Sequence, residues 1–421
     1  WNWMSENQKF TPLIPMNLFN SKEIEETEKF LLDNPQGIVI LTYGLLIEHI
    51  ERLEALPWNV VVFDEAQNLK TMATRRTTAA RRLKARFKVC LTGTPLENHY
   101  GEFFSLMDLA VPGALGEYKD FKADFLSEKT TLLQNRAQDP VRSNLTNQDF
   151  SASADNIAYL RKLIKPLLLR RTKAQILTEL PEKIETELHI PFEAKQKSIY
   201  RNAAIGCNES VQRAIESKGV VRAQIEMLTA LLRLRQICSD PASIPNVHYD
   251  KVPPKVETLV EALRTIVAEG DSALVFTQFL QTQSRIKKLL LEANIPCFEM
   301  KGSTPRHERV QILKSFDESD KGSALLMTLK TGGVGLNLVK ANYVFHIEPW
   351  WNPSVENQAT DRAHRIGQTK HVQVYRYIIT DSVEEKILAL QERKRALGAL
   401  VHQEAQAGGF ALSREELLEL L

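Results

Sequence analysis

The sequence predicts an α/β protein made of two parallel-sheet lobes with helical insertions between them. Two observations support this fold class. From residue 38 onward, short apolar runs alternate with helical stretches, the order typical of parallel α/β units, and the same alternation restarts after Pro253-Pro254. Between these parts, residues 116–250 lose the alternation and contain a long helical stretch at 195–237. We therefore expect one lobe on each side of a helical insert.

The first lobe, residues 1–115, is predicted to contain strands at 38–43, 59–65 and 87–94. The run NVVVFDE at 59–65 does not alternate apolar with polar residues, which favours a strand buried on both faces. Helices are expected after the first strand as far as residue 54, near 74–84 and near 102–109. Residues 116–250 follow and are expected to form the helical insert.

The second lobe, residues 251–380, is predicted to begin with an amphipathic helix. Val256, Leu259 and Leu263 lie at i, i+3 and i+7, and Gly270 ends this helix. Strands are predicted at 273–278, 297–300, 324–329, 343–347 and 372–378. Residues 381–421 are predicted to form a charged helical extension.

The composition excludes several classes of protein. Of 421 residues, 43% are hydrophobic and 25% charged, which is typical of globular proteins and not of disordered ones. No apolar run approaches the ~20 residues that cross a bilayer, so no membrane partner is expected. The net charge of +2 requires any nucleic-acid site to be a local patch. The scattered cysteines exclude common zinc ribbons and favour reduced thiols, namely Cys90, Cys207, Cys238 and Cys297.

An acidic pair follows the predicted strand at 59–63. Asp64 and Glu65 lie at the end of a parallel strand, where ligands bind in open sheets. An aspartate at this place binds Mg²⁺ through water, and an adjacent glutamate orients and deprotonates a water that attacks a phosphate. An ordinary acidic strand end is the alternative. The sequence TGTP at 92–95 lies at the same end of the next strand and is a second candidate there, with a plain turn as the alternative.

Two segments of the second lobe carry further candidate chemistry. The glycine-rich loop at 328–337 allows backbone amides to approach a phosphate, with a tight turn as the alternative. In QATDRAHRIGQ at 358–368, Arg362 and Arg365 are three residues apart, and Asp361 precedes Arg365 by four. On a helix they share one face, which suits arginine fingers that stabilise charge on a transferring phosphoryl group. A solvated charged face is the alternative.

Basic side chains that could contact DNA phosphates are scattered along the sequence. For any single one, a solvated surface position is the simpler interpretation. They form a site only if the fold gathers them on one face, and they are Arg75, Arg76, Arg81, Arg82, Arg170, Arg171, Lys173, Lys301, Arg306, Arg309 and Lys330.

In this order, the segments resemble the motor of the Swi/Snf-like ATPases in helicase superfamily two, over nearly the whole chain. The matching segments are LTYG at 41–44 (motif Ib), DEAQ at 64–67 (II), TGTPLEN at 92–98 (III), VFTQF at 275–279 (IV), TGGVGLN at 331–337 (V) and QATDRAHRIGQ at 358–368 (VI). LRRTK at 169–173, LPEK at 180–183 and LRQIC at 234–238 resemble family-specific stretches. The usual His-Pro after the last of these is replaced by Ser239-Asp240-Pro241.

The resemblance implies two RecA-like lobes, the first truncated at its N-terminal end, with ATP bound in the cleft between them. Asp64 and Glu65 would serve Mg²⁺ and the attacking water, and Arg362 and Arg365 would be the arginine fingers. The implied cofactor contacts are Gln67, Gly333, Gly335 and Gln358. The implied contacts with double-stranded DNA are Thr42, Tyr43, Thr94, Gln278, Lys301, Thr328, Lys330 and Trp350.

One departure from the family pattern affects the expected activity. The family's phosphate-binding loop ends in Gly-Lys-Ser/Thr, and this sequence contains no Gly-Lys dipeptide. Trp3 matches a tryptophan that follows the family's motif Ia. We therefore expect a fragment that begins after that motif, is inactive alone, and has a second lobe better ordered than its first.

The DEAQ form and the segment at 112–116 resemble prokaryotic family members. This implies a cytoplasmic, nucleoid-associated protein, or a nuclear one if the source is eukaryotic. The implied partners beyond DNA are DNA-bound proteins or the transcription machinery. Two alternatives stay open: a DNA-binding clamp or interaction platform without ATPase activity, and an unwinding helicase of another branch, which the family-specific insert disfavours.

Overall fold

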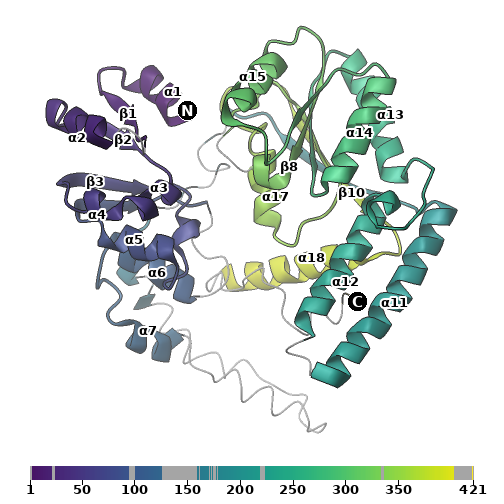
Figure 1. Ribbon diagram of the computed structural model, residues 1–421, viewed down its shortest axis with the longest axis horizontal. Coiled ribbons are helices and arrows are strands. Elements are labelled where there is room, and N and C mark those ends of the chain that lie inside the picture. Colours follow the sequence, from purple (N-terminus) through teal and green to yellow (C-terminus); the bar gives the residue numbers. More distant parts are fainter. Residues whose placement is uncertain are drawn as a thin grey trace. The chain divides into compact units, whose positions relative to one another are not determined.

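The computed structural model divides the chain into two compact units (Figure 1). Unit 1 comprises Trp1–Arg170 with Leu397–Phe410, and unit 2 comprises Arg171–Ala396 with Ala411–Leu421. The structure describes residues 2–20, 24–93, 100–125, 159–160, 162–169, 171, 173, 177, 179–218, 223–332, 336–402 and 420. Among them, no helix is both long enough and apolar enough to cross a membrane.

Unit 2 is built on a six-stranded sheet in which every neighbouring pair is parallel. The strand order is β5-β10-β9-β6-β8-β7. The strands are β5 (Lys183–Ile190), β6 (Ala273–Thr277), β7 (Cys297–Met300), β8 (Ala324–Thr328), β9 (Tyr343–His346) and β10 (Val372–Ile379). The five strands predicted for the second lobe are all present, and the predicted α/β fold class is confirmed.

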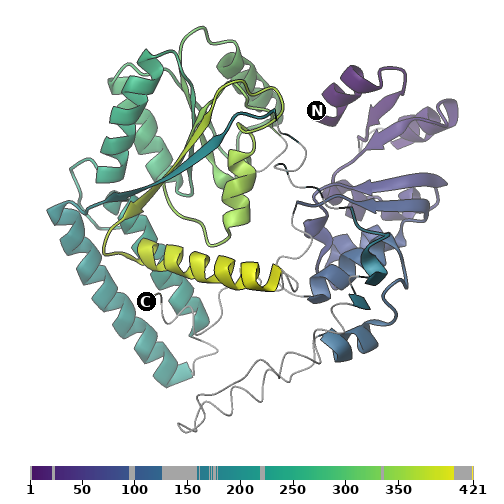
Figure 2. The ribbon, with the colours of Figure 1, turned by 180° about the vertical axis from the view of Figure 1, so that it is seen from behind.

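The strand β5 was not predicted. It lies within residues 116–250, which the sequence analysis assigned to a helical insert, yet it pairs with β10 over its whole length, from Lys183 opposite Val372 to Ile190 opposite Ile379. Figure 2 shows it as the teal arrow beside the last strand of the sheet. The domain bounds given above remain predictions, but the helical character assigned to this part of 116–250 is wrong.

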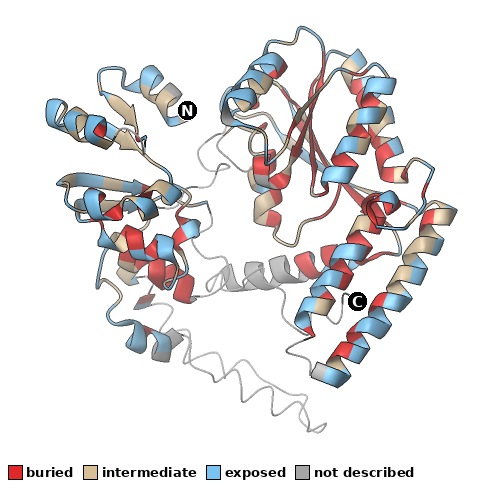
Figure 3. Ribbon diagram, in the orientation of Figure 1, coloured by how far each residue is buried: buried red, intermediate tan, exposed pale blue. Residues whose placement is uncertain are grey.

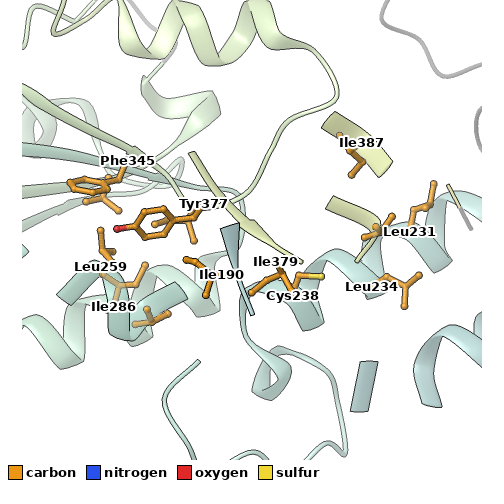
Figure 4. Close-up of a cluster of buried hydrophobic side chains, with 14 of the residues drawn as sticks. Ile190, Leu231, Leu234, Cys238, Leu259, Ile286, Phe345, Tyr377, Ile379 and Ile387 are labelled. Carbon is orange, nitrogen blue, oxygen red and sulfur yellow. The ribbon is translucent and has the colours of Figure 1, made fainter. Parts of the chain in front are cut away.

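The central strands β6, β8 and β9 are buried on both faces, and their successive side chains enter opposite cores. In β6, Val275 packs into one core and Leu274 and Phe276 into the other. Figure 4 shows the first core, in which Leu259 and Ile286 lie below the sheet residues Phe345 and Tyr377. Continuous apolar runs such as ALVFT are the sequence signature of strands covered on both faces.

Helices cover the sheet of unit 2 and extend from it. They are α11 (Ala194–Lys218), α12 (Gln224–Ser239), α13 (Pro254–Ala268), α14 (Leu280–Glu292), α15 (Arg306–Asp317), α16 (Leu329–Gly332), α17 (Pro353–Thr360) and α18 (Val383–His402). The first lobe-two helix was predicted correctly: Pro254 opens α13, and Val256, Leu259 and Leu263 are buried. The segment after α13 packs against Gly322, just before β8, where a Cβ would lie 2.3 Å from the Asp271 carbonyl oxygen.

Unit 1 contains two separate parallel strand pairs. The strands are β1 (Met16–Leu18) with β2 (Ile38–Ile40), and β3 (Trp58–Phe63) with β4 (Ala85–Cys90). The helices are α1 (Asn2–Phe10), α2 (Ile24–Asp33), α3 (Tyr43–Glu48), α4 (Ile50–Leu53), α5 (Arg75–Arg82), α6 (Tyr100–Ala110) and α7 (Tyr118–Phe125). The predicted strands and helices of the first lobe are therefore present; the strands and α5 are shorter than expected, and α6 is longer.

The β3–β4 pair is buried on one face only. Phe63 packs with helical residues such as Leu46, Leu69 and Leu106. The opposite face carries two cross-strand pairs, Val60 with Phe87 and Val62 with Val89, whose exposed fractions are 52, 61, 50 and 39%. Figure 3 shows this contrast between β3 and the strands of unit 2. The prediction of burial on both faces at 59–65 is therefore wrong, because helices of the described chain cover only one side.

Candidate functional site

The acidic pair of unit 1 lies in a hydrogen-bonded turn directly after β3. The Asp64 carboxylate accepts hydrogen bonds from the Trp3 indole N–H (3.1 Å) and the Glu65 backbone N–H (2.9 Å). Glu65 has φ +49°, the left-handed conformation that is uncommon for a residue with a side chain. Such outliers are often held in place at functional sites. The turn therefore presents two adjacent carboxylates at the carboxyl end of a parallel strand.

Gln67 connects this pair to the next strand end. Its Nε2 donates to Glu65 Oε2 (2.6 Å), and its Oε1 accepts from the Thr92 hydroxyl (2.8 Å). The segments identified as motifs II and III are thus joined through one carboxamide. Thr94, predicted to contact DNA, lies outside the described residues.

Thr42 and Tyr43, both predicted to contact DNA, border the same turn. The Thr42 hydroxyl caps α3 by accepting from the Leu45 N–H (3.3 Å). The Tyr43 hydroxyl donates to the Asp64 carbonyl (2.7 Å). Burial raises the pKa of Tyr43, and the nearby Cys90, Asp64 and Glu65 raise it further. The phenol therefore stays protonated and serves as a donor that fixes the turn.

A metal ion at this site would have few protein ligands. Among the described residues, no group of three or more His, Cys, Asp or Glu side chains is arranged to hold a metal. Mg²⁺ is commonly bound through one or two carboxylates together with water and substrate phosphates. The exposed Asp64 carboxylate fits that mode of binding, and an all-protein metal cage does not.

In unit 2, four predicted DNA contacts lie at one edge of the sheet. Gln278 follows β6, Lys301 follows β7, Thr328 ends β8 and Trp350 follows β9. These strands are consecutive neighbours in the order β9-β6-β8-β7, and all are parallel. Their carboxyl ends therefore meet at the same edge, where ligands bind in open α/β sheets. The fifth candidate of this unit, Lys330, has a side chain outside the described part.

Several basic candidates are instead used within the fold. Arg81 pairs with Asp108 at 2.8 Å, and Arg82 makes a two-pronged contact with Glu54. Arg309 donates to the Thr304 and Gly302 carbonyls at 2.8 and 2.7 Å, which closes the loop after β7. Lys301 lies 3.1 Å from Glu299, so its charge at the sheet edge is partly balanced. Arg170 and the Arg306 side chain lie outside the described residues.

The segment at 358–368 is helical only as far as Thr360, so the prediction that Asp361, Arg362 and Arg365 share a helical face is wrong. α17 ends at Thr360, and the chain continues through turns that include Gly367 at φ +101°. The buried Gln368 carboxamide donates to the carbonyls of Val339, Ala341 and Ala363. These bonds fold the segment back onto the chain near Leu338 and override the helical spacing. Gln358 lies on α17, whereas Gly333 and Gly335 lie outside the described residues.

Asp361 does not orient Arg365 as expected from its spacing. Its carboxylate pairs with Lys173 at 2.7 Å, and the same ammonium donates to the His364 carbonyl at 3.0 Å. His364 Nε2 in turn donates to the Pro181 carbonyl (2.8 Å). Lys173, the last residue of RRTK, and Pro181, within LPEK, thus contact the turn that contains Arg362 and Arg365. Sequence reasoning treated Lys173 only as a possible phosphate contact.

Comparison with known proteins agrees with this arrangement. The model of the SNF2-related domain matches residues 1–243, and that of the helicase conserved C-terminal domain matches residues 254–367. The chain belongs to the SNF2-related family. This assignment confirms the resemblance stated above to Swi/Snf-like members of helicase superfamily two.

Relatives of this SNF2-related chain occur in bacteria and eukaryotes. A Bacillus subtilis protein named ATP-dependent helicase/translocase YwqA is 34% identical over all of this chain and 44% of its own length. The yeast ISWI chromatin-remodeling complex ATPase ISW1 is 28% identical over 96% of this chain and 35% of its own. The chain spans less than half the length of the first curated relatives it matches. The SWI2/SNF2 ATPase core of Sulfolobus solfataricus in complex with dsDNA is 31% identical over all of this chain and 83% of that one, with a TM-score of 0.47.

Proposed function

We propose that this chain is the motor core of an ATP-dependent double-stranded-DNA translocase or remodeller. The observation that carries the proposal is the gathering of Gln278, Lys301, Thr328 and Trp350 at one edge of the unit 2 sheet. Amide, ammonium and hydroxyl groups are the donors that bind the DNA backbone without reading its sequence. The family assignment and the carboxylate turn of unit 1 support an ATP-driven motor over a passive binding surface.

The proposed nucleotide chemistry begins with the two carboxylates of unit 1. Asp64 would bind Mg²⁺, which supplies charge neutralisation of ATP phosphates when bound. Glu65 would orient and deprotonate the attacking water. The Gln67 carboxamide holds one Glu65 oxygen, so the remaining oxygen keeps a fixed direction. Through Thr92, the same carboxamide ties that geometry to the end of β4.

The arginines of unit 2 would stabilise charge on the transferring phosphoryl group. Arg362 and Arg365 lie in the turn that Lys173 and Pro181 contact through Asp361 and His364. The chain passes from unit 1 to unit 2 just before Lys173. Relative movement of the units would therefore be transmitted to the arginines through Lys173. Lys173 would act as a positioning residue in this scheme.

We further propose that the chain alone does not hydrolyse ATP. Its 421 residues contain no Gly-Lys dipeptide, the element that grips β- and γ-phosphates in phosphate-binding loops. The acidic pair would therefore work only when such a loop is supplied.

Relatives named TATA-binding protein-associated factors support an action on DNA-bound proteins or transcription machinery. The bacterial relatives support a cytoplasmic, nucleoid-associated location.

The test measures ATP hydrolysis and duplex binding by the chain, alone and extended at its N-terminus by the phosphate-binding region of a relative. Hydrolysis should appear only in the extended protein, should rise with duplex DNA more than with RNA, and should fall by at least about a hundredfold in Glu65→Gln. Glu48→Gln, on the exposed side of α3, serves as the control. An extended protein that binds duplex but stays inactive would favour a clamp, and stimulation by RNA would favour an unwinding helicase.

A further inference from the structure

A buried arginine lies behind the candidate DNA edge of unit 2. Arg235 is 2% exposed and projects from α12 among the apolar residues Leu231, Leu234 and Ile237. Its guanidinium Nη2 donates to Gln278 Oε1 at 2.6 Å and to the Pro349 carbonyl at 2.8 Å. An isolated charge in such a place is costly to bury, so its partners have to be strong and well placed.

The same guanidinium contacts two aromatic rings. It lies 4.6 Å from the ring centre of Trp351 and 5.7 Å from that of Trp350. Both distances fall within the range of cation–π attraction, which is larger in desolvated sites. Arg235 therefore contacts each residue of the turn at 349–351, through a carbonyl in one case and through rings in the other two.

Other buried polar groups hold the backbone of this turn. Glu356 of α17 accepts from the Trp350 N–H at 2.5 Å, and Gln391 of α18 donates to the Trp350 carbonyl. The Glu348 carboxylate, 1% exposed, accepts from the Gln278 N–H at 2.9 Å and from the Thr277 hydroxyl at 2.8 Å. It also accepts from the Ser239 hydroxyl of α12. Side chains of α12 thus contact the ends of both β6 and β9.

The hydrogen bond from Arg235 determines which way the Gln278 carboxamide faces. With Oε1 occupied by the guanidinium, the donors of this side chain are the two N–H groups on Nε2, one of which donates to the Pro349 carbonyl with an N···O distance of 3.4 Å. The other is left to meet an anionic acceptor at the sheet edge. A glutamine turned the other way would present its carbonyl oxygen, which repels a phosphate.

We propose that Arg235 is a positioning residue for duplex binding: it fixes the Gln278 carboxamide and the turn at 349–351 in the orientation that meets the DNA backbone. This inference rests on the proposed function of the chain. It gives the family-specific helix α12 a role, since that helix lies outside the sheet yet sets two of its DNA contacts.

The test measures duplex affinity of the chain by fluorescence anisotropy with a labelled 30-base-pair DNA, a length of about three helical turns. Arg235→Met should weaken binding about tenfold, and Arg235→Lys should fall between this variant and the parent, since lysine keeps the charge but cannot reach both acceptors. Arg233→Met is the matched control, because Arg233 is exposed on the same helix two residues earlier. It should bind within about twofold of the parent.

A double-mutant cycle separates positioning from general destabilisation. If Arg235 acts through Gln278, then Gln278→Ala should weaken binding about as much as Arg235→Met, and the double variant should be little weaker than either. Additive losses, or parental affinity of a folded Arg235→Met, would overturn the proposal. If Arg235→Met does not fold, the same cycle is measured with Arg235→Lys.

A second readout keeps the inference separate from the proposed function. If the parent does not bind duplex DNA at all, the proposed function fails, and the positioning of the turn is judged from tryptophan fluorescence. Arg235→Met should shift emission to the red and increase acrylamide quenching, and Trp351→Phe should remove most of that change. Unchanged emission in Arg235→Met would then refute the positioning role itself.

Discussion

The strands of the two units differ in what covers them. In unit 2, β6 has neighbours on both edges and a core on each face, and every one of its residues is buried. In unit 1, β3 pairs with β4 and has a core on one face, while Val60 and Val62 are half exposed on the other. Their sequences, ALVFT and WNVVVF, are similarly apolar. Composition therefore predicts the strand, whereas the surrounding chain decides how much of it is buried.

Among tests of this contrast, removal of the buried ion pair of unit 2 should have the largest effect. Lys255 and Glu384 are both fully buried, at 2.6 Å, and Lys255 also donates to the Ile347 carbonyl. Lys255→Met should lower the free energy of unfolding by about 3–5 kcal/mol, because it leaves a carboxylate buried without its partner. Urea unfolding monitored by amide hydrogen exchange should show this loss of stability in β6 and β9 and no change in β3 and β4.

Two controls accompany this variant. Combining Lys255→Met with Glu384→Leu should recover most of the loss, because replacing both charges by apolar groups is often neutral. Lys287→Met removes a partly exposed pair with Glu299 and should change stability by less than about 1 kcal/mol. A loss in Lys287→Met as large as that in Lys255→Met would contradict the importance of burial.

One identical substitution in each unit tests the contrast directly. Val275→Thr places a hydroxyl in the fully buried β6 and should cost about 2 kcal/mol. Val62→Thr makes the same change on the exposed face of β3 and should alter stability by less than about 0.5 kcal/mol. It should also reduce aggregation in light scattering, since it interrupts an exposed apolar face. Equal costs at the two positions would mean that the β3 face is covered in solution.

Acid should weaken unit 2 through His346. Burial, together with the nearby positive charge of Arg376, lowers the pKa of this imidazole to about 3. The unfolded chain takes up the proton near pH 6.5, whereas the folded chain does so only near pH 3, so stability falls as the pH drops below 6.5. Between pH 7 and 5 the loss should be about 2 kcal/mol. His346→Gln, measured by urea midpoints at both pH values, should remove that part of the acid response.

The smallest effect is expected at the edge of the unit 2 sheet. Burial alone would raise the pKa of Glu185, but hydrogen bonds from Lys183 and Arg376 lower it to about 2. Its contribution is therefore complete above pH 4.5 and disappears as the pH falls towards 2. Glu185→Gln should cost about 1 kcal/mol at pH 7, after allowing for solvent screening, and much less at pH 3. A cost that does not vary with pH would indicate lost packing.

The sequence predicted best those elements whose cause is local. Apolar runs bounded by turns located β6 to β10, and the spacing in α13 located its buried face. The strand β5 was missed although KIETELHI largely alternates apolar with polar residues, a strand pattern, because it lies beside a long helical stretch and its partner β10 is remote in the sequence. Pairing with β10 holds the strand by backbone contacts over its whole length, although Ile190 is the only buried residue in it.

In the candidate site, too, contacts between sequence neighbours were predictable and contacts between remote segments were not. Asp64, Glu65 and Gln67 are neighbours in sequence, so their association was foreseeable from the order of residues. The ion pair of Lys173 with Asp361 and the contacts of Arg235 join segments far apart in the chain, and no local pattern reports them. The sequence signal for Arg235 was weak: LLRLRQIC contains two arginines among apolar residues, and nothing in it separates the buried Arg235 from the exposed Arg233.

The pairing of β5 with β10 has a consequence for synthesis of the protein. Lys183 leaves the ribosome long before Val372, its partner, and bacterial and eukaryotic ribosomes add about 5–20 residues per second. For on the order of ten seconds or more, β5 therefore exists without the strand that holds it. Glu185 and Glu187 keep the waiting segment charged, and charge is what discourages an unpaired strand from joining another nascent chain.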